Sequence, residues 1–270
     1  MIKVNDALGF LKEPLYDKES QLCREDLGGF WARYWTCSDN VLAWRAFDLM
    51  GEPTYRDSIY KRLNAITIPC AAKHVATINH LHDPIISEKA TIDDPPGSDN
   101  CYSIDPSNWA ASPVAWTKPP SSGIFHEDHK GGPFNDYADP GLGNGYANLC
   151  FLEAISYRNQ GNSTKASSLF RSGMDKWDSK KGGFNDMPYA KDPSRYFDTY
   201  KLALSIISSI KVNGALPEIY SVLDAKLTQQ QGSNGGIYSK YTATANKQGS
   251  ENCETTAMAI IAYKLQPKKS

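Results

Sequence analysis

Paired glycines recur along this chain, with the first glycine of each pair at position 28, 131, 182 or 235. The second and third pairs begin a longer shared phrase, GGPFNDYADP from residue 131 and GGFNDMPYAKDP from residue 182. The later intervals are about 50 residues long and the first is about twice that, which is the spacing expected of a repeat architecture. The chain is therefore expected to build one supersecondary unit several times.

Each unit is predicted to be a pair of helices followed by a Gly-rich loop. In the unit after Gly182, Leu202, Ile206 and Ile210 recur at helical spacing, and Gly214 marks the helix end. Apolar helices are expected to begin near residues 39, 144, 197 and 254, and amphipathic helices near residues 53, 162 and 215. This alternation predicts an inner and an outer helical layer.

Residues 71–130 interrupt the pattern. This interval is rich in proline and contains all five histidines of the chain, so we expect an irregular Pro/His-rich insertion within a single domain that spans residues 1–270. His126 and His129 flank two acids, which is compatible with a small metal site, but a solvated polar loop is the expectation. No metal and no other cofactor is expected.

The composition excludes two classes of partner. Lys and Arg total 29 and Asp and Glu total 30, so no basic field favours nucleic acid. No apolar run is long enough to span a membrane, and a hydrophobic content of 40% suits a soluble protein with a sizeable core.

Six cysteines without a CxxC spacing leave the compartment open, with a slight preference for an extracytoplasmic one.

The Gly-Gly-aromatic loops at 28, 182 and 235, together with the helix starts SDNVLAWRAF and ENCETTAMAIIAY, resemble the α/α-toroid superfamily. That superfamily includes six-hairpin glycosidases, polysaccharide lyases, and the terpenoid cyclase and protein prenyltransferase group. The resemblance covers roughly residues 1–70 and 131–265. It implies an all-α fold, an (α/α) toroid of repeated helical hairpins in which the apolar helices all begin at one end. A straight solenoid is the alternative.

Four acids near the predicted helix starts and in the repeated loops are the candidate catalytic residues. They are Asp39, Asp136, Asp186 and Glu254. A glycosidase needs two carboxyl groups that face one glycosidic bond, and a ring of acids at one end of a toroid can supply such a pair. Acids at helix starts also cap free N–H groups, and loop acids also form turns, so these structural roles stay open.

Aromatic residues surround these acids and are the candidate substrate-binding residues. They are Trp31, Trp35, Tyr137, Tyr146, Tyr200 and Tyr241. Rings with polar edges stack on sugar faces and hydrogen-bond to hydroxyl groups, although such rings also pack between loops and helices.

These features predict a carbohydrate-active enzyme, either a glycoside hydrolase or a polysaccharide lyase. Its oligosaccharide or polysaccharide substrate would occupy an acidic, aromatic-lined cleft at the Gly-Gly end. Asp136 and Asp186 are expected in adjacent loops, with their side chains directed toward one solvent-filled mouth. The alternatives are a toroid that binds glycan or protein without catalysis, and a protein similar to terpenoid cyclases.

Overall fold

The computed structural model describes residues 1–28, 37–65, 67–68, 74–75, 114–117, 126–129, 145–159, 161–186, 189–190 and 194–267. The α-helices of this part of the chain are α1 (Val4–Phe10), α2 (Cys37–Met50), α3 (Pro53–Ala65), α5 (Ala147–Asn159), α6 (Ser163–Met174), α8 (Tyr200–Asn213), α9 (Tyr220–Gln229) and α10 (Cys253–Lys264). A short π-helix, η1 (Leu11–Leu15), continues α1.

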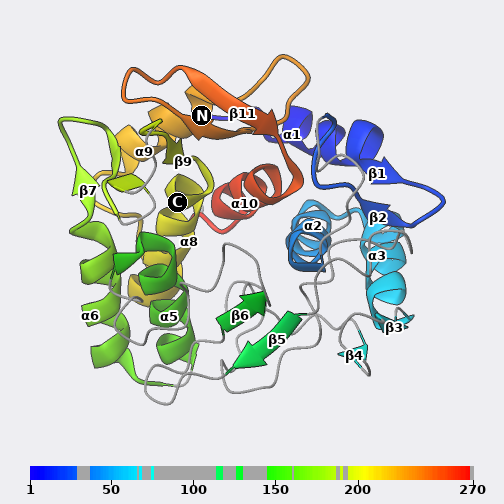
Figure 1. Ribbon diagram of the computed structural model, residues 1–270, viewed down its shortest axis with the longest axis horizontal. Helices are drawn as coiled ribbons and strands as arrows, with labels where there is room; N and C mark the ends of the chain where they lie inside the picture. The colour runs from blue at the N-terminus through cyan, green and yellow to red at the C-terminus, as the bar shows by residue number, and fades with distance from the viewer. Residues whose placement is uncertain are drawn as a thin grey trace.

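Helices α2, α10, α8 and α5 form the buried layer. Helix α10 packs against α2 and α8, and α8 packs in turn against α5, so these four helices form an arc (Figure 1). Every residue from Ala257 to Ala262 is fully buried, because α10 is apolar on all its faces. The amphipathic helices α3, α6 and α9 pack against α2, α5 and α8. The predicted alternation of apolar and amphipathic helices is confirmed for these elements.

Short antiparallel strands connect the helices, and they show that the predicted fold class is wrong. The pairs are β1 (Tyr16–Asp17) with β2 (Leu22–Cys23), β3 (Thr67–Ile68) with β4 (His74–Val75), β5 (Val114–Thr117) with β6 (His126–His129), and β7 (Trp177–Asp178) with β8 (Gly183–Phe184). A three-stranded sheet has the order β11 (Lys247–Glu251), β10 (Tyr238–Tyr241), β9 (Phe197–Asp198). The protein is therefore not an all-α toroid. Helical periodicity identified the helices, but it carries no information about backbone pairing between the loops.

In the interval 71–130 the structure describes residues 74–75, 114–117 and 126–129, and the rest of the expected insertion lies outside the described residues. Strand β4 pairs with β3, and β5 pairs with β6 through four residues on each strand. Prolines exclude long helices but leave room for short strands between them.

Two hairpins share one backbone pattern although their sequences differ. In β1–β2 the Gln21 N–H donates to Asp17 O at 2.8 Å, and in β7–β8 the Gly182 N–H donates to Asp178 O at 2.7 Å. Gln21 and Gly182 both have positive φ, 61° and 68°. The counterpart of the Gly182–Gly183 pair is therefore Gln21–Leu22, and the predicted repeat frame, which used the glycines at 28 and 29, is shifted by seven residues.

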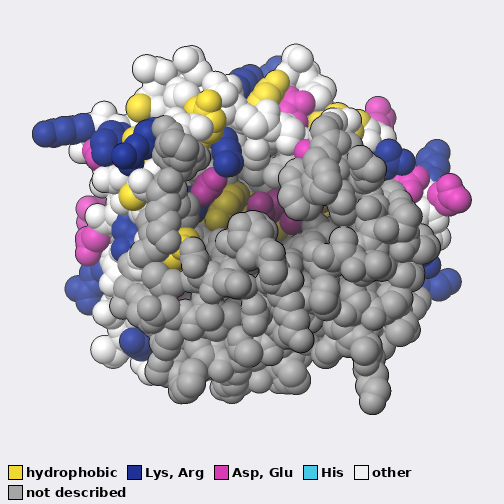
Figure 2. Space-filling model, in the orientation of Figure 1, with side chains coloured by type: hydrophobic (Ala, Val, Ile, Leu, Met, Phe, Trp, Pro, Cys, Tyr) yellow, Lys and Arg dark blue, Asp and Glu magenta, His cyan; other side chains and the backbone are white. Residues whose placement is uncertain are grey.

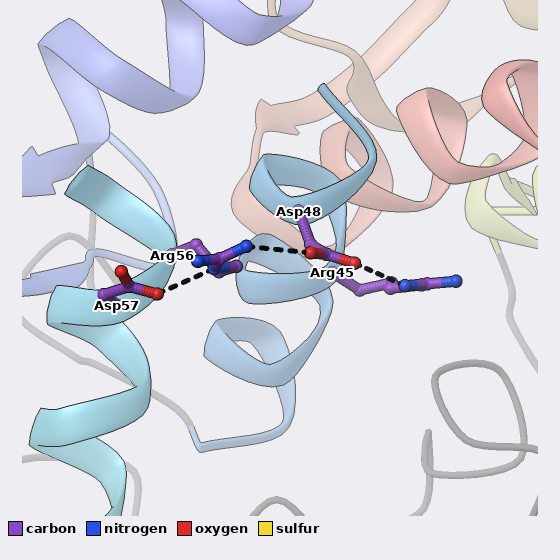
Figure 3. Close-up of polar contacts among 4 residues, drawn as sticks. All are labelled: Arg45, Asp48, Arg56 and Asp57. Atoms are coloured by element: carbon purple, nitrogen blue, oxygen red, sulfur yellow. Dashed lines mark hydrogen bonds and ion pairs between the residues drawn. The ribbon is translucent and has the colours of Figure 1, made fainter. Parts of the chain in front are cut away.

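An ion-pair network links α2 and α3 at the surface (Figure 3). Asp48 accepts from Arg45 at 2.5 Å and from Arg56 at 3.3 Å, and Arg56 also pairs with Asp57 at 2.7 Å. These side chains are partly exposed, so we expect them to orient the helix pair more than to stabilise it. Among the described residues, the helices are all too short or too polar to cross a lipid bilayer.

Candidate functional site

The three-stranded sheet places the starts of α8 and α10 beside each other. Strand β9 leads into α8 and β11 leads into α10, and both strands pair with β10. The Thr199 N–H donates to Ser239 O at 2.8 Å, and the Ile237 N–H donates to Thr256 Oγ1 at 3.0 Å. Asn252 caps α10, because its side-chain oxygen accepts from Thr255 N at 3.0 Å.

The segment that follows β2 is held between α2 and α10. The Asn40 side chain on α2 accepts from Cys23 N at 2.7 Å and donates to Cys23 O at 2.9 Å. The Cys253 N–H donates to Glu25 O at 2.8 Å, and Ser250 Oγ donates to Asp26 Oδ2 at 3.0 Å. These contacts fix the backbone of Glu25 and Asp26 near the first turns of both helices.

Glu25, Asp39 and Glu254 form what we call the three-carboxyl cluster. Asp39 lies in the first turn of α2, and Glu254 lies in the first turn of α10. Burial, together with the negative charges of Asp39, Glu254 and Asp26, raises the pKa of Glu25 from its ordinary 4.5 to about 9. The Oε2 atom of Glu25 has no hydrogen-bond partner among the described residues.

The pKa of Glu254 is raised by its surroundings in the same way. Burial raises its pKa well above the ordinary value, Asp39 and Asp198 add to the rise, and only Lys201 acts against it. Acidic and hydrophobic side chains of the described residues are visible near the middle of the face in Figure 2, over the region where α10 lies in Figure 1. With these raised pKa values, Glu25 and Glu254 keep their protons at neutral pH and can donate them.

Asp186, Lys201 and Asp198 form a second group, which we call the Lys201 triad. The Lys201 ammonium group lies 2.7 Å from Asp186 Oδ2 and 2.9 Å from Asp198 Oδ2. The side chain of Asp186 is 0% exposed and that of Lys201 is 3% exposed. Asp186 Oδ2 also accepts from Ala147 N, the first residue of α5, at 3.1 Å. Burial acts to lower the pKa of Lys201, but the two carboxylates outweigh it and the pKa is raised, so this lysine stays charged.

Two buried thiols lie next to the three-carboxyl cluster. Cys253 Sγ donates to Asp39 O at 3.7 Å, and Cys23 Sγ donates to Leu11 O at 3.8 Å. A hydrogen bond with Cys23, together with burial, raises the pKa of Cys253 well above its ordinary value. Cys253 therefore stays a thiol and is a poor nucleophile.

The structure brings together two of the four predicted catalytic acids. Asp39 and Glu254 meet in the three-carboxyl cluster, where Asp39 raises the pKa of Glu254. Asp186 lies in the Lys201 triad, buried and ion-paired, so it does not face the solvent-filled mouth that the sequence predicts for it. Asp136 lies outside the described residues.

The predicted substrate-binding aromatics fall into two groups. Trp31, Trp35 and Tyr137 lie outside the described residues. Tyr146 and Tyr241 are buried, and Tyr200, the first residue of α8, is half-buried. The Tyr241 hydroxyl donates to Gly182 O at 3.1 Å, and its ring packs on Phe197 with centroids 5.3 Å apart. Tyr241 thus joins the three-stranded sheet to the turn of the β7–β8 hairpin.

Sequence reasoning missed Glu25 and Lys201. Glu25 was overlooked because the repeat frame was placed on the glycines at 28 and 29 instead of Gln21–Leu22, and the corrected frame aligns Glu25 with Asp186. The sequence does place Lys201 three residues after Asp198, and in the structure the two side chains pair across the junction of β9 and α8 at 2.9 Å. Within the described residues, no group of three or more His, Cys, Asp or Glu side chains is arranged to hold a metal ion.

Comparisons with known proteins do not assign a family. No protein-family model matches the chain, and no curated protein matches it. A solved structure titled as the crystal structure of D-mannose isomerase is similar, with a TM-score of 0.35 and 14% sequence identity. The alignment covers 95% of this chain and 62% of the isomerase chain, so this chain spans less than two thirds of that protein's length.

Proposed function

We propose that this protein is a carbohydrate-active enzyme that uses the three-carboxyl cluster for general acid–base catalysis. The observation that supports this proposal is electrostatic. Two of the carboxyl groups, those of Glu25 and Glu254, have pKa values raised by burial and by Asp39. An acid that keeps its proton at neutral pH can protonate a leaving-group oxygen, and a neighbouring carboxylate can act as the base or nucleophile.

Glu254 is the proposed general acid and Asp39 is its proposed partner. Both lie in the first turns of helices whose positions are set by hydrogen bonds to neighbouring loops, so the pair belongs to rigid elements. The pairing of two carboxyl groups suits glycoside hydrolysis better than elimination, because elimination from a uronate needs a base and a charge-neutralising group. The choice of a carbohydrate substrate rests on the sequence, in which aromatic residues accompany the acids.

The test is a screen of oligosaccharides and polysaccharides for new reducing ends, followed by the variants Glu254→Gln and Asp39→Asn. Each substitution should lower turnover by about 100-fold or more, because general acid–base groups contribute rate factors of this size. The matched control is Glu218→Gln, since Glu218 is exposed in the loop before α9. Its turnover should equal that of the unmodified protein.

Three other results would overturn the proposal or part of it. Unsaturated products in place of new reducing ends alone would identify a lyase. Saccharide binding that survives in Glu254→Gln, with no turnover in the unmodified protein, would identify a binding protein. Neither binding nor turnover across the screen would remove carbohydrate as the ligand class.

A further inference from the structure

The Lys201 triad contains a buried positive charge that the proposed chemistry does not use directly. A buried lysine that stays charged is a poor nucleophile and a poor base, because both roles need the neutral amine. Lys201 also has no exposed surface of consequence, since its side chain is 3% exposed. Its function must therefore act through the groups around it.

The backbone brings the start of the helix that carries Lys201 close to the start of the helix that carries Glu254. Lys201 is in the first turn of α8 and Glu254 is in the first turn of α10, and the two helices pack against each other. Strands β9 and β11, which precede these helices, both pair with β10. The sheet therefore sets the distance between the two helix starts.

The orientation of the ammonium group is also fixed. Asp186 and Asp198 hold it at 2.7 and 2.9 Å, and Asp186 is itself held by Ala147 N at 3.1 Å and by Tyr189 N at 3.5 Å. A lysine on a flexible stem would otherwise lose its position, because its four-carbon chain has many rotamers.

We propose that Lys201 is a positioning residue for Glu254: its ammonium group, fixed between Asp186 and Asp198, sets how readily the Glu254 carboxyl group releases its proton. The charged groups that face Glu254 come from four segments. They are Asp39 on α2, Asp198 on β9, Lys201 on α8, and Glu25 after β2. The catalytic meaning of this role rests on the proposed function, whereas the electrostatic link between the two residues does not.

The electrostatic link is tested without a substrate. The carboxyl carbon of Glu254 is followed by NMR in protein labelled with ¹³C-glutamate, and Glu254→Gln assigns the signal. In the double variant Asp186→Asn/Lys201→Met, which removes one charge of each sign, the pKa of Glu254 should rise because Lys201 no longer opposes the rise. In Asp198→Asn the pKa should fall, because a neighbouring negative charge is lost.

Opposite shifts in the two variants support the proposal. An unchanged pKa in the double variant, or shifts of the same sign in both, would overturn it. Asp186→Asn keeps an acceptor for Ala147 N, and an unchanged far-ultraviolet circular dichroism spectrum verifies that both variants fold.

A second measurement connects the link to catalysis. If Glu254 is the general acid, kcat/KM falls as the pH rises through its pKa, so the double variant should extend activity to higher pH. A shifted carboxyl titration without any turnover in the unmodified protein would keep Lys201 as the residue that tunes Glu254 and reject the proposed function. A shifted titration with an unshifted activity profile would reject the positioning role.

Discussion

Glu25 and Asp186 occupy equivalent positions after two hairpins with the same backbone pattern, yet their surroundings are opposite. Arg24 N bonds to Leu15 O at 2.9 Å and Asn185 N bonds to Lys176 O at 2.8 Å, so the two hairpins correspond up to the residue before each acid. Asp186 meets a buried ammonium group and a helix N-terminus. Glu25 meets other carboxyl groups and has an unpartnered oxygen.

The difference comes from the helix beside each hairpin. The sequence offset that relates Asp186 to Glu25 also relates Lys201 to Asn40. Asn40 bonds to the backbone of Cys23 and offers no charge, whereas Lys201 neutralises its acid. One backbone unit therefore carries a buried ion pair at one place and an acid with a raised pKa at the other.

Removing Asp186, the acid that pairs with Lys201, should have the largest effect on stability. Asp186→Ala should lower the free energy of unfolding by about 1 to 3 kcal/mol, because it removes one of the two carboxylates that hold the buried Lys201 ammonium group and leaves only Asp198. It also removes the acceptor for Ala147 N. Denaturant unfolding measures the change. A loss below about 1 kcal/mol, typical of an exposed acid, would contradict the buried assignment.

Replacing Glu25, the equivalent acid in the other hairpin, should stabilise the protein instead of destabilising it. Because the pKa of Glu25 is raised from 4.5 to about 9, the unfolded chain releases this proton first, and Glu25 makes unfolding easier as the pH rises through that interval. Glu25→Gln should therefore match the unmodified protein near pH 4 and melt at a higher temperature near pH 9. Melting curves across this range test the prediction, with Glu218→Gln as control. A difference that shrinks as the pH rises would contradict it.

The turn itself should give the smallest effects, and they should be opposite in the two hairpins. Gly182→Ala should destabilise the protein by about 1 to 2 kcal/mol, because φ is 68° there and an added Cβ would lie 2.8 Å from Lys226 Cε. Gln21→Gly relieves the same backbone strain and should stabilise by up to about 1 kcal/mol. Urea midpoints compare the two variants. Effects of equal sign would show that the hairpins are not equivalent.

Much of the helical framework was predictable from the sequence. The buried helices begin at Cys37, Ala147, Tyr200 and Cys253, and the expected starts near 39, 144, 197 and 254 lie within a few residues of these positions. The amphipathic partners α3 and α6 begin at or beside the expected residues, and α9 begins five residues late. Apolar periodicity and turn glycines are local signals, and they are sufficient to predict helices, which are themselves local elements.

The strands escaped prediction because pairing depends on residues far apart in the chain. Strand β9 pairs with β10, and neither segment has a long alternating pattern. The first repeat was misplaced for a different reason, since Gln21 adopts a positive φ, which residues other than glycine rarely do.

By itself, the sequence determined where the helices lie, which of them are apolar, and that Asp39 and Glu254 stand at helix starts. Only the tertiary structure decided which acids are neutralised. Asp39, Asp186 and Glu254 are the same kind of group in the sequence, but the charge state of a buried carboxyl group depends on its neighbours in space. Lys201 forms an ion pair with Asp186, whereas Glu254 interacts electrostatically with Glu25 and Asp39. The packing of α2, α8 and α10 thus separates a structural acid from the candidate catalytic ones.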